Sequence, residues 1–424
     1  MTNEFTEKMT KLRNNFTMIA MKQKENISIN ELDKKQFKVR LAESSDNEKA
    51  VLSHYLHNIH NGVSEHYKQE AFQVLEEYVS YKVAEEKCSI DVEEAIQQLL
   101  FEVENVPFPT PNPYKFKFID LFAGIGGFRI AMQNLGGKCV FTSEWDKDAQ
   151  RTYQANFGEI PFGDITKQSV KNYIPSQFDL LCAGFPCQAF SIAGKRGGFD
   201  DTRGTLFFDV AEIIQKHQPK AIFLENVKGL TSHDKGRTFE VIKNTLEDLG
   251  YSVFTKIINA ADFGVPQNRE RIFIVGFHQQ KMPANLSFEF PEPDATPVFI
   301  NQFLEKGVSG YSISKHLQKT YMFKKEDGKP QIVDENSSIQ VKTLVSTYHK
   351  IQRLTGTFVR DGETDLRLLT VNECKRIMGF PEHYQVPVSR TQAYRQFGNS
   401  VAVPAIQATA QKIIELLKDN ESTK

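Results

Sequence analysis

The fold of this 424-residue chain is predicted most directly from residues 181–190, which read Leu181-Cys-Ala-Gly-Phe-Pro-Cys-Gln-Ala-Phe190. The apolar run from Phe178 to Gly184 is typical of a buried strand in a parallel sheet. Phe185-Pro186 ends that strand, because proline cannot donate a hydrogen bond to a neighbouring strand. Ligands of open α/β sheets bind beyond the carboxyl ends of the strands. The thiol of Cys187 is therefore placed to act as a nucleophile, and an ordinary buried cysteine is the alternative.

Strands and helices alternate from Lys115 onward. Candidate strands are Phe116–Leu121, Cys139–Glu144, Phe178–Ala183, Ala221–Glu225, Ser252–Asn259 and Arg271–Phe277. Helical segments lie between most of them, such as Asp201–Lys216 and Thr238–Leu249. This alternation predicts a doubly wound α/β domain.

Composition excludes several classes of protein. The chain is 40% hydrophobic and 25% charged, which is ordinary for a globular protein. No apolar run is long enough to span a bilayer, and the polar N-terminus lacks the apolar core of a secretion signal. The five cysteines show neither metal-ligand nor disulfide spacing, which predicts a reducing cytoplasm: Cys88, Cys139, Cys182, Cys187 and Cys374. The net charge of -1 means that a nucleic-acid binder would have to gather its basic residues on one face.

A glycine loop after the first strand predicts a ligand pocket. It comprises Phe122, Ala123, Gly124, Ile125, Gly126 and Gly127, and a helix follows it. Glycines allow close approach of the backbone to a ligand, and a helix N-terminus presents free N–H groups, although a tight turn is the alternative. Glu144 ends the next strand, where an acid suits ribose hydroxyls, and Trp145 offers a flat face for an adenine. With Asp164 and Ile165, which follow a third short segment, these residues predict an adenosine pocket without a pyrophosphate site.

Two further stretches bring acid and basic groups to the same edge of the predicted sheet. Glu225 ends an apolar strand, so burial would favour its protonated form and make it an acid, with Asn226 orienting it. Residues 267–271 read Gln267-Asn-Arg-Glu-Arg271 and deliver Arg269 and Arg271 to the next strand. A backbone-bonded glutamate and a surface ion pair are the alternatives.

These motifs, in this order, resemble those of the DNA cytosine-5 methyltransferases. The resemblance rests on Phe118-Ile-Asp-Leu-Phe-Ala-Gly-Ile-Gly-Gly127, Phe185-Pro-Cys-Gln188, Glu225-Asn-Val227 and Gln267-Asn-Arg-Glu-Arg271, and it covers roughly residues 114–415. It implies a Rossmann-like domain that binds S-adenosylmethionine, releases S-adenosylhomocysteine and needs no metal. Cys187 would attack a flipped cytosine, Glu225 would donate to its N3, and Arg271 would hold its O2. Arg269 would support the loop or a phosphate, and Gln267 belongs to the same catalytic motif.

The resemblance also assigns ligand contacts elsewhere in the chain. Phe122 would stack near the adenine and Pro186 would line the pocket. The last motif would return Asn399, Ser400 and Val401 to the cofactor. The loop that follows Cys187 is rich in glycine and basic residues, and in the family it closes over the DNA minor groove. A solvated surface loop is the alternative reading of its candidate DNA contacts, which are Gln188, Ser191, Lys195, Arg196 and Arg203.

The α/β alternation stops between about residues 281 and 365. From Val308 to Arg360 there are nine Lys and Arg against four Asp and Glu, with aromatic residues among them, which suits a surface that reads nucleic acid. This segment resembles the recognition regions of MspI-type enzymes, and the catalytic half resembles HpaII-type enzymes, both of which act on CCGG. A CCNGG-type target is the alternative. Candidate DNA contacts are Lys342, Thr347, Tyr348, Lys350, Gln352 and Arg353.

Four segments are expected. Residues 1–112 form a helical N-terminal domain or extension, because Glu65–Tyr78 and Asp91–Phe101 show helical spacing, and a proline-rich linker follows at Val106–Pro113. Residues 113–282 form the catalytic domain, 283–366 the target recognition domain, and 367–424 return to the catalytic domain.

The predicted partner is double-stranded DNA, bound by a monomer in a bacterial cytoplasm. A cognate restriction endonuclease is a possible genetic partner. An RNA methyltransferase with the same motifs is one competing interpretation. A second is a non-enzymatic DNA-binding regulator built on an inactive methyltransferase. DNA-binding regulation by the N-terminal domain is an added role, for which accessory packing or self-association is the alternative.

Overall fold

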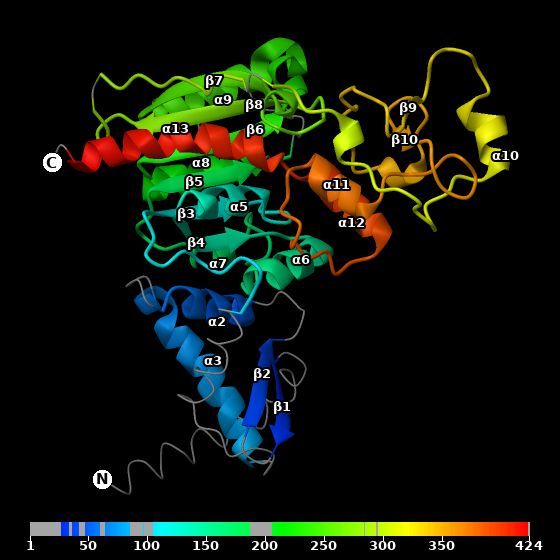
Figure 1. Ribbon diagram of the computed structural model, residues 1–424. Coiled ribbons are helices and arrows are strands. Elements are labelled where there is room, and N and C mark those ends of the chain that lie inside the picture. The colour runs from blue at the N-terminus through cyan, green and yellow to red at the C-terminus, as the bar shows by residue number, and fades with distance from the viewer. Residues whose placement is uncertain are drawn as a thin grey trace, which may run out of the picture.

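The computed structural model describes residues 27–33, 36–41, 47–59, 64–84, 96, 105–186, 206–283, 285–293 and 296–422. Figure 1 shows a central sheet with helices on both faces, a second small sheet to its right, and the N-terminal elements below. No helix in the described ranges is both long and apolar enough to cross a membrane.

A six-stranded sheet forms the centre of the molecule. Its strands are β3 (Phe116–Leu121), β4 (Gly137–Ser143), β5 (Leu180–Gly184), β6 (Ala221–Val227), β7 (Tyr251–Asn259) and β8 (Glu270–His278). They lie in the order β4-β3-β5-β6-β8-β7. The first four are parallel, whereas β8 is antiparallel to both β6 and β7. The predicted α/β fold is confirmed, with an antiparallel pair at one edge.

Alternating strand residues divide the core into two layers. Phe118, Cys182 and Phe223 face the layer that holds α5 and α13. Ile119, Leu181 and Ile222 face the layer that holds α8 and α9. Successive side chains of a strand point to opposite faces, so strands that are apolar throughout can bury both faces. The helices of this half are α5 (Gly127–Asn134), α6 (Lys147–Phe157), α7 (Gln168–Lys171), α8 (Leu206–His217), α9 (Arg237–Asp248) and α13 (Val403–Ser422).

The region between β8 and α13 is largely irregular, as expected. Its small sheet pairs β9 (Gln331–Val333) with β10 (Thr357–Val359) in parallel. Its α-helices are α10 (Lys315–Leu317), α11 (Val371–Ile377) and α12 (Arg390–Asn399). Short helical turns complete the chain: η2 (Lys228–Thr231), η3 (His233–Gly236), η4 (Ala260–Asp262), η5 (Ile300–Gln302), η6 (Gln318–Met322) and η7 (Tyr348–Lys350).

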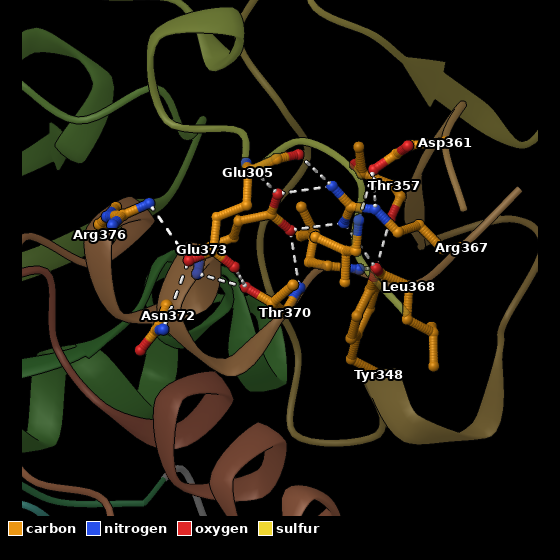
Figure 2. A network of polar contacts seen from close by, with 12 residues as sticks. Glu305, Tyr348, Thr357, Asp361, Arg367, Leu368, Thr370, Asn372, Glu373 and Arg376 are labelled. Atoms are coloured by element: carbon orange, nitrogen blue, oxygen red, sulfur yellow. Dashed lines mark hydrogen bonds and ion pairs between the residues drawn. The ribbon is translucent and has the colours of Figure 1, made fainter. Parts of the chain in front are cut away.

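A buried polar network joins this irregular region to α11 (Figure 2). Arg367 is fully buried and donates to both carboxylate oxygens of Glu373, at 2.8 and 2.9 Å. It also donates to Asp361 at 2.9 Å and to the carbonyl of Glu305 at 2.8 Å. Glu373 in turn forms a capping box with Thr370 at the start of α11. The network therefore fastens the chain where it enters and where it leaves the irregular region.

The N-terminal part contains more than helices. β1 (Ile27–Asp33) and β2 (Gln36–Leu41) form an antiparallel hairpin, which the sequence analysis did not predict. The helices are α2 (Asn47–His57) and α3 (Ser64–Ala84), and α3 contains the predicted helix Glu65–Tyr78. The predicted helix Asp91–Phe101 lies outside the described residues, apart from Ile96.

Candidate active site

The glycine loop and the end of β4 are joined through Glu144. The amide of Gly124 donates to one carboxylate oxygen of Glu144 at 2.7 Å, and the amide of Asp146 donates to the other at 2.8 Å. Phe122 and Gly124 have positive φ angles of 53° and 55°, so the loop turns sharply at the carboxyl end of β3. Each carboxylate oxygen of Glu144 can accept a further hydrogen bond, which leaves capacity for the hydroxyls of a ribose.

Close packing explains the two later glycines. A Cβ at Gly126 would lie under 3.0 Å from the ring of Phe157, and one at Gly127 would lie under 3.0 Å from Val401. The hydroxyl of Ser400 is 3.1 Å from the same Cβ position at Gly127. The structure thus brings Ser400 and Val401 of the last motif against the glycine loop, as expected.

The remaining predicted cofactor residues differ in exposure. Trp145 is 77% exposed at the end of β4, where a ligand could cover its ring. Asp164 accepts from the amide and the hydroxyl of Thr166, at 3.0 and 2.8 Å, and so closes a local turn. The side chain of Ile165 is buried in the core, whereas Pro186 and Asn399 are exposed.

Asp120 is a candidate cofactor residue that the sequence analysis missed. Its side chain is fully buried in β3, and neither carboxylate oxygen has a hydrogen-bond partner in the described residues. Burial raises the pKa of Asp120 to about 8, although Arg129 opposes this effect. Buried carboxylates are normally paired. The unpaired carboxyl group of Asp120, two residues before the glycine loop, is therefore a candidate partner for a positively charged group of a ligand. The available signal was the acid inside the apolar run Phe118-Ile-Asp-Leu121.

Glu225 and Arg271 meet at the carboxyl end of β6. Nε of Arg271 lies 3.0 Å from a carboxylate oxygen of Glu225, and both side chains are largely buried. They can meet because β6 and β8 are antiparallel and Val227 pairs with Arg271. Burial raises the pKa of the Glu225 carboxyl, and Arg271 and Arg269 oppose that rise. The arrangement can offer a proton from Glu225 and hydrogen bonds from Arg271 to one planar ligand.

Asn226 fixes the turn that leads toward Cys187. Its side-chain amide donates to the carbonyl of Phe185 at 2.8 Å, and its side-chain oxygen accepts from the amide of Val227 at 2.8 Å. The end of β5 is therefore tied to the end of β6. Cys187 lies outside the described residues, as do the other predicted residues of its loop: Gln188, Ser191, Lys195, Arg196 and Arg203.

Gln267 and Arg269 make internal hydrogen bonds, and Arg269 lies close enough to Glu225 to oppose the rise in its pKa. Gln267 is fully buried and accepts from the amide of Leu344 at 2.8 Å. Arg269 donates to the carbonyls of Leu344, Gly398 and Ser400, at 3.0, 3.0 and 2.5 Å. The residue is only 2% exposed, and its guanidinium cannot reach a phosphate while these bonds are made. Both are positioning residues that tie β8 to the irregular region and to the turn after α12.

Two predicted DNA contacts are also corrected. The ring of Tyr348 is buried, and its hydroxyl donates to the carbonyl of Thr357 at 2.5 Å. Arg353 is 7% exposed and forms an ion pair with Asp327. It also donates to the carbonyls of Met322, Lys325 and Lys329. Both side chains hold the recognition segment together, so they are not free to read bases.

The other candidates in this segment remain accessible. Lys350 is exposed, and Lys342, Thr347 and Gln352 are partly exposed. The side-chain oxygen of Gln352 accepts from the hydroxyls of Thr347 and Thr355, both at 3.1 Å. These two bonds orient the amide group of Gln352.

A polar groove connects the catalytic edge with the recognition segment. Its volume is about 510 Å³, and it is lined by residues of β6, η2, β7, β8 and the stretch near Thr343, among them Lys228, Asn259, Asn268, Arg271 and Thr343. Thr343 donates to the carbonyl of Asn268 at 2.6 Å. The groove places Arg271 within reach of a ligand that lies between the two parts. Among the residues described, no group of histidine, cysteine and acidic side chains has the arrangement of a metal site.

Comparison with known proteins identifies the family. The model of the C-5 cytosine-specific DNA methylases matches residues 116–415. The chain belongs to the C-5 cytosine-specific DNA methylase family. It is 57% identical over 304 residues to the type II methyltransferase M.MspI of Moraxella sp., an alignment that covers 72% of this chain and 71% of that protein. It is 55% identical over 349 residues to M.HpaII of Haemophilus parainfluenzae, covering 77% and 96%.

Solved structures of methyltransferases share the fold. The Entamoeba histolytica methyltransferase EhMeth superposes with a TM-score of 0.58 and 22% identity, over 72% of this chain and 99% of that chain. Dnmt2 of S. pombe gives the same TM-score and coverage with 20% identity. The chain is thus a DNA cytosine-5 methyltransferase with a Rossmann-like fold.

Proposed function

We propose that this methyltransferase transfers a methyl group from S-adenosylmethionine to carbon 5 of a flipped cytosine in duplex DNA, with CCGG as the target. The observation that carries the proposal is the Glu225–Arg271 pair, which lies at 3.0 Å beside the groove and next to the turn that precedes Cys187. We infer a catalytic domain at 113–282, a recognition domain at 283–366 and a returning segment at 367–424.

The residues around the glycine loop fit S-adenosylmethionine. When bound, this cofactor supplies a methyl group attached to a positively charged sulfur. Asp120 would lose its proton and balance the positive charge of a bound ligand, because a nearby cation lowers the pKa of a carboxyl group and its buried oxygens have no partner in the described residues. Glu144 would accept from the ribose hydroxyls, and Trp145 would cover the adenine. Gly124 lies open on that side, since a Cβ there would meet no atom within 4 Å.

Carbon 5 of cytosine is a poor nucleophile, so the catalytic residues must activate it before it can accept a methyl group. The thiolate of Cys187 forms a bond to carbon 6. Glu225 donates its proton to N3, and Arg271 donates hydrogen bonds to O2, so the charge that develops on the ring is relieved. Carbon 5 would then take the methyl group, and the electron pair of the broken methyl–sulfur bond would stay on the cofactor's sulfur. Loss of the carbon 5 proton to solvent restores the double bond and expels the Cys187 thiolate from carbon 6. The proton on N3 returns to Glu225.

Burial of Glu225 supports its role as the acid. Its carboxyl is inside the protein, and burial raises its pKa, which increases the fraction that carries a proton near neutral pH. The target atoms are inaccessible inside a duplex, so the base must leave the stack to reach this pair. The polar groove between β8 and Thr343 has the position that such a base requires.

The target assignment rests on the recognition segment. Its sequence resembles MspI-type regions, and relatives named M.MspI and M.HpaII are 57% and 55% identical. The same relatives are named type II methyltransferases, which supports a modification role beside a restriction endonuclease. A monomer bound to DNA in the cytoplasm fits this role.

The deciding experiment is sequencing of duplex DNA treated with the purified full chain and S-adenosylmethionine, with a readout for 5-methylcytosine. We expect modification confined to CCGG, and no modification by Cys187→Ser, which should still bind cofactor. Modification at CCNGG or another site would refute the target, and modification of transfer RNA alone would refute the substrate class. Continued turnover by Cys187→Ser would refute the covalent mechanism.

A further inference from the structure

Helix α2 is packed into the catalytic core. All nine residues from Lys49 to His57 are buried, although the apolar residues of the helix are not concentrated on one face. Its apolar side chains share a cluster with Val140 and Phe141 of β4 and with Phe162. Figure 1 shows α2 directly below β4 and α7, whereas the hairpin β1–β2 lies further from the sheet. A helix buried in this way is part of the catalytic fold and not a separable module.

The part of the core that α2 covers leads to the cofactor pocket. β4 is an edge strand of the sheet and ends just before Glu144. The short stretch around Phe162 runs beside β4: its amide donates to the carbonyl of Thr142 at 2.9 Å, and its carbonyl accepts from Glu144 at 2.8 Å. Two residues later this stretch reaches Asp164. The positions of Glu144 and Asp164 therefore depend on how β4 and the stretch around Phe162 lie against each other.

Two side chains of α2 hold both strands through buried hydrogen bonds. The hydroxyl of Ser53 accepts from the amide of Ile160 at 3.0 Å. Nε2 of His54 lies 3.1 Å from the amide nitrogen of Thr142 and 2.7 Å from a carboxylate oxygen of Glu159. The other ring nitrogen of His54 lies 2.8 Å from the carbonyl of Ala50, which fixes the ring on the helix. An edge strand has unpaired backbone groups, and His54 lies against one of them.

A second set of contacts runs from α2 to the glycine loop. His57 contacts the guanidinium of Arg129 in α5, and Arg129 forms an ion pair with Glu159 at 2.6 Å. The guanidinium also lies over the ring of Phe157, 4.8 Å from its centre. A Cβ at Gly126 would collide with that same ring. The ring therefore links the buried charge cluster to the loop that would contact the cofactor.

We propose that α2 positions the cofactor pocket, with Ser53 and His54 as positioning residues that set the geometry of Glu144, Asp164 and the glycine loop. This inference rests on the proposed function, because it takes the ligand of that pocket to be S-adenosylmethionine. It gives the N-terminal region a role in cofactor affinity that does not require contact with DNA. Loss of either hydrogen bond leaves a buried amide without its partner and lets the strands shift.

The test measures cofactor binding directly. Trp145 is the only tryptophan of the chain and is 77% exposed, so its fluorescence should report titration with S-adenosylhomocysteine. Equilibrium dialysis with the labelled compound gives a second readout. We expect Ser53→Ala and His54→Phe to raise the dissociation constant about tenfold, because strands that have shifted in the free protein must be brought back into place when the ligand binds. With saturating cofactor, kcat and the KM for DNA should stay within about twofold of wild type.

A matched control lies on the neighbouring helix α3. Lys68 forms an exposed ion pair with Glu65, so Lys68→Ala should leave cofactor affinity unchanged. Wild-type affinity in both α2 variants would overturn the inference. A parallel loss of kcat, DNA binding and thermal stability would also overturn it, because that result describes general destabilisation. If the wild-type chain itself failed to bind the compound, the cofactor assignment would be wrong, which is a different outcome.

Discussion

Asp120 and Glu225 show how burial changes the chemistry of single carboxyl groups. Glu225 has Arg271 at 3.0 Å, which opposes the effect of burial on its pKa. Asp120 has no hydrogen-bond partner among the described residues, and its pKa rises to about 8. In the unfolded chain an aspartate titrates near 4. Between these two values the folded protein binds a proton that the unfolded chain does not.

The pH dependence of stability should follow from this difference. The contribution of the Asp120 carboxyl to the free energy of unfolding is fully present below about pH 4. It is lost as the pH rises toward 8, because the folded protein must then retain a proton that the unfolded chain has already lost. We therefore expect Asp120→Asn to gain stability relative to wild type as the pH rises from 5 to 8, by several °C in Tm. The gain should level off above pH 8, and it should be measured without cofactor by thermal unfolding.

Asp248 provides the control for this measurement, because it is exposed at the end of α9. Asp248→Asn should shift Tm by only a small amount, because the side chain is exposed and its replacement disturbs no packing. A difference between Asp120→Asn and wild type that stayed constant from pH 5 to 9 would show that Asp120 does not titrate as described.

At the scale of elements, the carboxyl end of α12 is pressed against the recognition segment. A Cβ at Gly398 would lie under 3.0 Å from backbone atoms of Val345 and Ser346. The carbonyl of Gly398 accepts from Arg269 at 3.0 Å. Because the obstacle is backbone, a side chain here cannot be accommodated by a change of rotamer.

Gly398→Ala should therefore destabilise the protein, although alanine favours helix by up to about 1 kcal/mol. We expect a loss of about 1–3 kcal/mol in the free energy of unfolding, as is typical of overpacking, measured by urea titration. Gly229→Ala is the matched control, since a Cβ at Gly229 would meet nothing within 4 Å. A Gly398→Ala variant as stable as this control would contradict the packing argument.

At the scale of the whole molecule, one buried arginine joins the recognition segment to α11 and the rest of the catalytic half. Arg367 binds Glu373, Asp361 and the carbonyl of Glu305 (Figure 2). Glu305 lies near the start of the recognition segment and Arg367 at its end. Arg269 makes a second junction, between β8 and the turn after α12. The orientation of the recognition segment over the groove depends on both.

Arg367→Met should leave the buried carboxylate of Glu373 without its ionic partner. Breaking a buried pair in this way costs about 3–5 kcal/mol, and urea unfolding should show a loss of that size. Lys306→Met removes an ion pair with Glu335 in which both side chains are exposed, and it should leave the urea unfolding curve nearly unchanged, because solvent screens such a pair. Equal losses in the two variants would show that burial of the network is not what stabilises the junction.

Much of the catalytic half was predictable from sequence because its signals are local. Strand positions such as Phe116–Leu121 follow from apolar runs, and the sheet edge at which Glu144 and Glu225 lie follows from the rule for parallel sheets. The family resemblance added roles for residues that lie far apart, such as Ser400 and Val401 beside Gly127. The hairpin β1–β2 was missed, although Gln36-Phe-Lys-Val-Arg-Leu41 alternates polar and apolar residues as a half-buried strand does.

The sequence by itself determined the α/β fold, the family and the residue types available for the chemistry. Only the tertiary structure decided which polar side chains face ligand and which are used internally. Arg353 looks like a DNA contact as sequence and Arg269 like part of the catalytic motif, yet backbone carbonyls from distant segments occupy both guanidinium groups. Asp120 looks like one polar residue in a strand, yet its carboxyl oxygens are buried in the core without a partner among the described residues. The physical reason is that hydrogen bonds between distant segments depend on packing, which no local pattern encodes.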